Sequence, residues 1–139
     1  MEIKVRAWDK KEKKMIENVG VFYSDNTAYI YKYTSPALGY TEVFINAKYP
    51  DRFVPMLYTN CKDKNGKEIY KDDIVKNDYG QIGRVVFKHG AFVFQWNDNT
   101  ETYWSADPDS ENDIEVIGNI WENPDLLKGG NNANQIKNR

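Results

Sequence analysis

Cysteine and histidine are nearly absent from this chain of 139 residues, which has one of each, Cys61 and His89. A single cysteine cannot form an internal disulfide, which fits a reducing compartment. A metal site or a nucleophilic pair made from these residue types would depend on Cys61 and His89 alone. We interpret His89, which precedes Gly90, as a turn residue, and Cys61 as a small apolar side chain in a strand. The sequence therefore predicts no cofactor and no metal site.

Long hydrophobic runs and an excess of basic charge are also lacking. No apolar run approaches the roughly 20 residues of a membrane-spanning helix, and charged side chains occupy the first positions, where a signal peptide would be apolar. These features predict a cytoplasmic protein without a membrane partner. The net charge of −2 argues against a general binder of nucleic-acid backbones, which normally carries a basic patch.

Aromatic residues are plentiful, at 14% of the chain with ten Tyr and four Trp. Such side chains suit half-buried pleated surfaces, so we expect a mainly β fold of several short, twisted antiparallel sheets. Strands are predicted at 3–8, 15–16, 21–23, 27–33 and 40–45 and, after a loop at 46–55, at 58–64, 67–70, 74–76, 83–88, 91–96, 101–105 and 114–120. The last five short strands predict an SH3-like barrel in the C-terminal half. Its core is predicted to contain Ile74, Val85, Phe87, Phe92, Phe94, Val116 and Ile120.

A hairpin is predicted at the centre of the chain. Asn65-Gly66 is the dipeptide that best suits a type I′ turn, in which two successive residues have positive φ. A second tight turn is predicted at Lys71-Asp72-Asp73, because Asp tolerates the left-handed conformation and its carboxylate accepts backbone N–H bonds. The two turns organise the strands on either side of them.

The run at 58–75, YTNCKDKNGKEIYKDDIV, resembles the pattern YTGLxDKNGxEIYEGDIV of the YopX family of small phage and prophage proteins. Residues 6–9 (RAWD) and 116–126 (VIGNIWENPDL) match the family in the same order. Asn60-Cys61 and Asp72 stand where that pattern has Gly-Leu and Gly, and Asn and Asp are the residues best able to replace Gly at positive φ. The resemblance implies a phage or prophage protein in the cytoplasm of a host cell, and it brings no catalytic or ligand residues with it.

Three segments make up the predicted organisation. Residues 1–56 form an N-terminal β lobe, and residues 57–128 form the hairpin and the barrel, in one compact unit with the lobe. Asn123-Pro124 starts a helix of at most one turn, since Asn is a good N-cap and Pro suits the first helical position. The Asn- and Gly-rich residues 129–139 are predicted to be a disordered tail.

The candidate binding surface consists of polar and aromatic residues from the three segments that match the family: Arg6, Trp8, Asp9, Asp63, Lys64, Tyr70, Asp73, Asn119 and Glu122. Most of them can serve as turn and cap residues. Arg6 is a candidate ion-pair partner of Asp9 or Glu122, and Trp8 is a candidate interface anchor.

Three other patterns have both a structural and a functional interpretation. The charge run at 10–14 is a solvated turn or a nucleic-acid patch. The tyrosine row, Tyr29, Tyr31 and Tyr33, covers a core or an interface, or stacks on a ligand. Asp107, Asp109, Glu111 and Asp113 alternate as in a calcium loop, but Asn112 and Gly118 stand where such a loop needs Gly and Glu. We favour the structural interpretation in each case and leave open the role of the acidic loop, 107–115.

The sequence favours a non-enzymatic binding or assembly module that forms homo-oligomers and has a host or phage protein as partner. The alternative is a nucleic-acid-binding accessory protein that acts through the barrel, with Lys62, Lys64, Lys67 and Lys71 around the hairpin. The net charge does not favour that alternative. A third interpretation is an enzyme that acts through the carboxylates of Asp63, Glu68 and Asp73.

Overall fold

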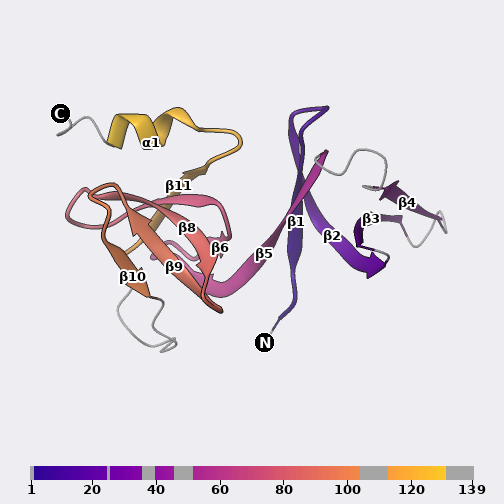
Figure 1. Cartoon of the computed structure of the whole chain (residues 1–139), viewed down its shortest axis with the longest axis horizontal. Helices are drawn as coiled ribbons and strands as arrows, with labels where there is room; N and C mark the ends of the chain where they lie inside the picture. Colours follow the sequence, from indigo (N-terminus) through magenta and orange to yellow (C-terminus); the bar gives the residue numbers. More distant parts are fainter. Residues whose placement is uncertain (1, 25, 36–39, 46–51, 104–112, 131–139) are drawn as a thin grey trace. The chain divides into compact units, whose positions relative to one another are not determined.

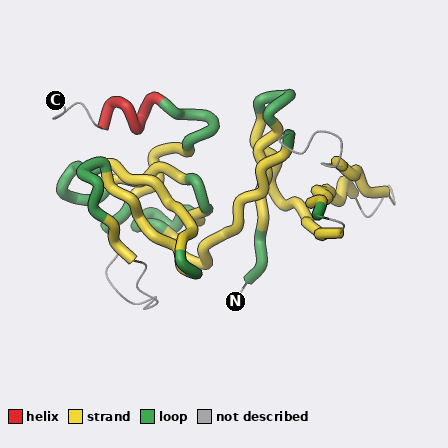
Figure 2. The backbone as a smooth tube through the Cα atoms, viewed as in Figure 1, coloured by secondary structure: helices red, strands yellow, loops and turns green. Residues whose placement is uncertain are grey.

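The computed structural model describes the chain apart from residues 1, 25, 36–39, 46–51, 104–112 and 131–139. The described part contains eleven strands and one short helix (Figure 1). The chain divides into two compact units, Met1–Tyr58 and Thr59–Arg139. Strands and the loops between them make up almost all of both units (Figure 2), so the mainly β prediction is confirmed.

The first unit is an antiparallel meander. Its strands are β1 (Val5–Asp9), β2 (Lys14–Ser24), β3 (Thr27–Ser35), β4 (Tyr40–Ile45) and the first half of β5 (Phe53–Lys62). The strand order is β4-β3-β2-β1-β5, and β6 (Glu68–Tyr70) adds to β5 as the sixth strand. Two boundaries differ from the sequence prediction. β2 is continuous where two short strands were expected, and β5 begins at Phe53, inside the predicted loop 46–55, because Phe53 pairs with Asp9 of β1.

The two faces of this sheet differ. A buried cluster on one face contains Ala7, Ile16, Val19, Ile30 and Phe53. The pairing register shifts between Val5 and Ala7, opposite Val19 and Ile16, and Asn18 in this segment of β2 has a φ of +55°. This β-bulge lets both Ile16 and Val19 contribute to the same core.

The second unit contains the β5–β6 hairpin and a five-stranded antiparallel sheet. The strands of that sheet are β7 (Asp73–Lys76), β8 (Ile82–Lys88), β9 (Ala91–Trp96), β10 (Glu101–Tyr103) and β11 (Glu115–Asn119). Their order is β10-β9-β8-β7-β11, so β11 returns to pair with β7, the first strand of the meander. In the part of the chain that the structure describes, β10 and β11 do not pair with each other, and the sheet is not closed into a barrel.

The core of the second unit consists of Ile69, Val75, Val85, Phe94, Trp96, Ile114 and Val116, with Phe92 packed against it. The prediction was correct for Val85, Phe94 and Val116, and Phe92 packs at the margin. It was wrong for Phe87, which lies opposite Phe92 near the hairpin end of β8 and is 51% exposed. Ile74 is fully buried, but it follows the alternation of β7 and lies on the face opposite Val75. Ile120 follows the end of β11 and is half-buried.

Helix α1 (Asp125–Gly130) has six residues, more than the single turn predicted, and includes two residues of the predicted tail. The remainder of that tail, 131–139, lies outside the described residues. Gly118 allows the segment before α1 to fold back on β11, because an added Cβ would come within 2.5 Å of Asn123 Oδ1 and 2.9 Å of Leu126 Cδ1. No helix in the described ranges is long and apolar enough to cross a membrane.

Candidate binding surface

Asp9 clamps the turn that follows β1. Its buried carboxylate accepts the backbone N–H groups of Lys11 and Glu12 at 3.0 and 3.2 Å. Arg52 donates Nε to Oδ1 and Nη2 to Oδ2, both at 3.0 Å. The hydrogen bonds from Arg52 and the two backbone N–H groups outweigh the opposing effect of burial and lower the pKa of Asp9. The carboxylate thus holds the lysine-rich turn in a fixed shape, with Arg52 as a partner from a segment predicted to be a loop.

This lowered pKa predicts a loss of stability in acid. A carboxyl group whose pKa is lower in the folded state than its ordinary 3.8 stabilises the fold above that pH, and this contribution is lost as the pH falls through the folded-state pKa. We expect Arg52→Gln to reduce the stability difference between neutral pH and pH about 3, measured by urea unfolding. Lys11→Gln, at an exposed position, is the control. An unchanged pH dependence in Arg52→Gln would contradict the assigned role.

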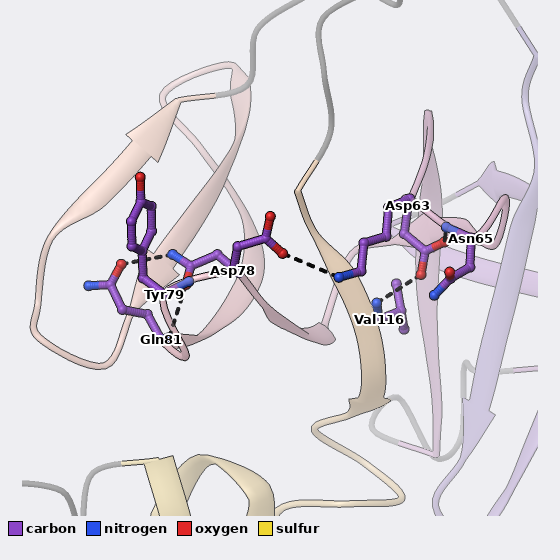
Figure 3. A network of polar contacts seen from close by, with 8 residues as sticks. Asp63, Asn65, Asp78, Tyr79, Gln81 and Val116 are labelled. Atoms are coloured by element: carbon purple, nitrogen blue, oxygen red, sulfur yellow. Dashed lines mark hydrogen bonds and ion pairs between the residues drawn. The ribbon is translucent and has the colours of Figure 1, made fainter.

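Asp63 clamps the tip of the β5–β6 hairpin and attaches it to the neighbouring sheet (Figure 3). Its Oδ1 accepts the N–H groups of Asn65 and Lys67 at 2.8 and 2.9 Å, and its Oδ2 accepts that of Val116 at 2.9 Å. The backbone N–H of Lys64 donates to the carbonyl of Ile114 at 2.9 Å. Burial raises the pKa of Asp63, but the three backbone donors outweigh burial, and the pKa is lowered. The carboxylate therefore takes the place of a strand partner beside β11.

The hairpin turn is not the type I′ turn predicted from Asn65-Gly66. Of these two residues only Gly66 has a positive φ, +84°, and its N–H donates to the carbonyl of Asp63 at 3.0 Å. These features describe a type I turn followed by a glycine bulge, with Asp at the first position and Gly at the fourth. The Asp63 carboxylate favours it by binding the Asn65 N–H. Positive φ at two successive residues occurs instead at His89 and Gly90, with +54° and +79°, which confirms His89 as a turn residue.

Asn77 clamps a third turn, between β7 and β8, in the same way. Its buried side-chain oxygen accepts the N–H groups of Tyr79 and Gln81, both at 3.0 Å. Its side-chain amide donates to Gln81 Oε1 at 2.8 Å. Side-chain as well as backbone hydrogen bonds therefore hold this turn.

Polar contacts link this turn to its neighbours on both sides. Lys64 Nζ lies 3.3 Å from Asp78 Oδ1, and this contact connects the turn at 77–81 to the Asp63 turn (Figure 3). Gln81 Nε2 donates to Asp98 Oδ2 at 3.0 Å, which connects it to the turn between β9 and β10. Asp98 itself accepts the Thr100 hydroxyl and N–H, and these bonds lower its pKa. We call the three linked turns, 63–67, 77–81 and 97–100, the turn rim.

Tyr79 is a large hydrophobic side chain of the turn rim and is 87% exposed. Its ring is shown beside Asp78 and Gln81 in Figure 3. Tyr79 lies between the predicted strands 74–76 and 83–88 and was not among the predicted surface residues. The available signal was the spacing of Asn77 before Gly80, which is typical of a turn with its asparagine side chain bound to the backbone.

Asp72 is the centre of a second polar cluster, in the turn between β6 and β7. It is fully buried and has a φ of +71°. Trp121 donates its indole N–H to Oδ2 at 3.1 Å, while Lys71 Nζ and Arg84 Nη2 lie 3.2 and 3.5 Å from Oδ1. The two cationic side chains are 35% and 38% exposed. We call Lys71 and Arg84 the cationic pair.

The nine predicted surface residues are divided between the units. Arg6, Trp8 and Asp9 lie in the first unit, and Asp63, Lys64, Tyr70, Asp73, Asn119 and Glu122 lie in the second. Lys64 and Glu122 are exposed, and the other seven are buried. Their contribution to a shared binding surface stays a prediction, but several have clear structural contacts.

Asp73 and Asn119 bind backbone groups at the ends of strands. Asp73 Oδ2 accepts the Tyr70 N–H at 2.8 Å. Asn119 Oδ1 accepts the N–H groups of Trp121 and Glu122 at 3.0 and 2.8 Å, and its amide donates to Glu122 Oε1. Among the described residues, no group of three or more His, Cys, Asp or Glu side chains could hold a metal ion.

The aromatic row of the first unit is only partly described. Tyr29 and Tyr31 alternate along β3 and share a face, as predicted, and Phe22 of β2 stacks on Tyr29 with ring centroids 4.7 Å apart. Gly20 makes room for Tyr31, because an added Cβ would come within 2.1 Å of its ring. The side chain of Tyr33, and the acidic residues Asp107, Asp109 and Glu111, lie outside the described residues.

Comparisons with solved structures and family models identify proteins that are similar to this chain. The crystal structure of protein EF1440 from Enterococcus faecalis is 29% identical, with a TM-score of 0.65 over 91% of this chain and 99% of that one. Protein yopX from Bacillus subtilis is 22% identical and shares the fold, with a TM-score of 0.61 over 91% of this chain and 97% of that one. A comparison with curated proteins gave no match. The family model described as YopX protein matches residues 4–128, and the chain therefore belongs to the YopX family.

Proposed function

We propose that this phage- or prophage-derived protein is a non-enzymatic binding or assembly module that acts in the host-cell cytoplasm and forms homo-oligomers. The observation that carries the proposal is Tyr79, an aromatic side chain exposed at 87% on a turn that side-chain hydrogen bonds hold in place. A solvent-exposed ring on such a turn is an anchor for a protein partner.

The physical argument is one of preorganisation. Tyr is enriched among the residues that dominate interface energetics, and its two χ angles limit the entropy lost on binding. The bonds from Asn77 fix the backbone of the turn before a partner arrives, so that binding does not have to order it. Lys64, Asp78 and Asp98 provide polar groups on the same turn rim, as the rim of an interface does.

We also propose an SH3-like architecture for the second unit, and its strand order supports this proposal. β11 pairs with β7, so the first and the last of the five strands lie next to each other. A barrel-like arrangement of this meander requires such a pairing. The same architecture supports the alternative, a nucleic-acid-binding accessory protein, for which exposed Lys62 and Lys67 on the hairpin are the favourable observation. Two other hairpin lysines, Lys64 and Lys71, already face Asp78 and Asp72.

The test is the mass of the protein in solution, measured by light scattering over a range of concentrations. We expect a mass above the 16.2 kDa of one chain, and a return to that mass in Tyr79→Ser. Tyr103→Thr, at another exposed tyrosine, is the matched control and should keep the wild-type mass. Both substitutions are at exposed positions and should leave the fold intact.

Two further outcomes distinguish the proposals. A monomer that gains mass only when single-stranded DNA or RNA is added, in a salt-dependent way, would overturn homo-oligomerisation and favour the alternative. A monomer that gains no mass with nucleic acid and captures no host or phage protein would contradict both.

A further inference from the structure

We propose that the cationic pair, Lys71 and Arg84, binds the phosphate group of a ligand. This inference is independent of Tyr79 and the turn rim, because it depends only on the cluster around Asp72. Three observations carry it: the way in which Asp72 is bound, the unused donors of Arg84, and the balance of charges nearby.

Asp72 has enough partners without Arg84. The indole N–H of Trp121 binds one oxygen at 3.1 Å, and the ammonium group of Lys71 lies 3.2 Å from the other. The Arg84 contact, at 3.5 Å, is at the outer limit of a hydrogen bond. One buried carboxylate oxygen thus faces two half-exposed cations, and the contact with Arg84 is the longer of the two.

Arg84 differs in this respect from Arg52. Arg52 makes two hydrogen bonds of 3.0 Å with Asp9, a forked arrangement that uses the guanidinium fully. Arg84 makes one long contact, and its Nε is buried with no hydrogen-bond partner. A guanidinium with five donors and one distant acceptor is poorly satisfied in the free protein. A small outward rotation of this half-exposed side chain would let a bound oxyanion provide the acceptors.

The charges on the adjacent strands permit an anion. Arg84 of β8 lies opposite Gln95 of β9, which lies opposite Glu101 of β10. Glu101 is bound by Lys88, so its charge is matched locally. On the side of β9 and β10, the carboxylate nearest to Arg84 in the strand pairing is therefore already bound by a cation.

The donor geometry favours phosphate over carboxylate. The guanidinium fork offers two parallel N–H donors, and the ammonium of Lys71, close to the same Asp72 oxygen, offers a third. A phosphate group has three or more oxygens to accept them, whereas a carboxylate has two. The ligand class is thus a phosphate monoester or free phosphate.

The Nε–H of each arginine gives its own signal in a proton–nitrogen correlation spectrum, which provides a direct test on the full chain. We expect inorganic phosphate, at ionic strength matched with chloride, to shift the Arg84 Nε–H signal and the Trp121 indole signal saturably. The Arg52 signal is an internal control and should stay unchanged, because its donors are already used by Asp9.

Variants then identify the residues responsible. Lys71→Gln and Arg84→Gln should each weaken binding, followed through the Trp121 indole signal, by about tenfold, the effect of losing a charged hydrogen bond. Lys76→Gln, at an exposed lysine of β7, is the control and should bind as wild type. Backbone spectra of the variants show whether the fold is kept.

Glycerol phosphate, with glycerol as the uncharged control, distinguishes the two sources of the phosphate group. Tighter binding of the ester than of inorganic phosphate supports a phosphorylated ligand, and equal binding supports recognition of the phosphate group alone. A shift that follows ionic strength without saturating, or unchanged affinity in Arg84→Gln, would overturn the proposal. Neither result depends on the mass measurement that tests Tyr79.

Discussion

Asp63→Ala should destabilise the second unit by about 3 kcal/mol. The substitution leaves three backbone N–H groups, of Asn65, Lys67 and Val116, without the oxygens that accept them. The Val116 bond joins residues 53 apart in the sequence and is buried, so water cannot replace the lost acceptor there. Urea unfolding measures the free energy, and hydrogen exchange at the Val116 amide should accelerate.

Two further variants test whether the Asp63 carboxylate and its hydrogen bonds are responsible for the loss of stability. Asp63→Asn keeps one oxygen for the turn but places an amide group against the Val116 N–H, so its loss of stability should be intermediate. Asp78→Ala removes an exposed carboxylate whose contact is a surface pair with Lys64, and its effect should stay within about 0.5 kcal/mol. Equal stabilities of Asp63→Ala and Asp78→Ala would show that Asp63 does not attach the hairpin to β11.

Features that depend on the residues within a few positions could be predicted from the sequence. Asn60 and Asp72 were expected at positive φ because they stand where the YopX pattern has Gly, and their φ values are +69° and +71°. At Asn60 the bend in β5 is fixed by Thr59, whose hydroxyl donates to the Ile69 carbonyl and accepts the Cys61 N–H. The local conformational preference and the observed backbone agree.

Features that depend on distant residues could not be predicted in this way. The partner of Asp9 is Arg52, 43 residues later, and the pairing of Phe53 with Asp9 extended β5 into a predicted loop. The type I′ prediction failed because the carboxylate of Asp63 stabilises a different turn from the one that Asn65-Gly66 prefers alone. Such contacts are a property of the folded sheet rather than of any short segment.

The candidate surface shows the same division. Seven of the nine candidate residues are buried, and several of these, among them Asp9, Asp63 and Asn119, bind backbone N–H groups. Of the side chains on which our proposals depend, Tyr79 and Arg84 lie outside the segments that match the family, and Lys71 lies inside one of them. In this chain a polar residue of the family pattern can serve to bind the backbone of a turn, and the geometry identifies that role.

Substitutions at Asp72 should separate the contribution of its backbone from that of its carboxylate, with the largest loss in Asp72→Ala. Alanine is strained at the φ of +71° and also leaves the Trp121 indole N–H without its acceptor, for a combined loss of about 3 kcal/mol. Asp72→Gly removes the backbone strain and should cost about 1–2 kcal/mol. Asp72→Asn tolerates the left-handed conformation and can still accept the indole N–H, so it should lose the least, about 1 kcal/mol.

The order of these three variants, measured by urea unfolding and by the position of the Trp121 indole signal, carries the conclusion. If glycine were as destabilising as alanine, the backbone conformation would contribute nothing and the carboxylate would account for the whole effect. If Asp72→Gly were as stable as the wild type, the carboxylate would be dispensable for stability. Its remaining effect would then be the negative charge that it places beside the cationic pair. The expected intermediate value for glycine requires both contributions, because the positive φ places Asp72 in the turn and the carboxylate then connects that turn to Trp121 after β11.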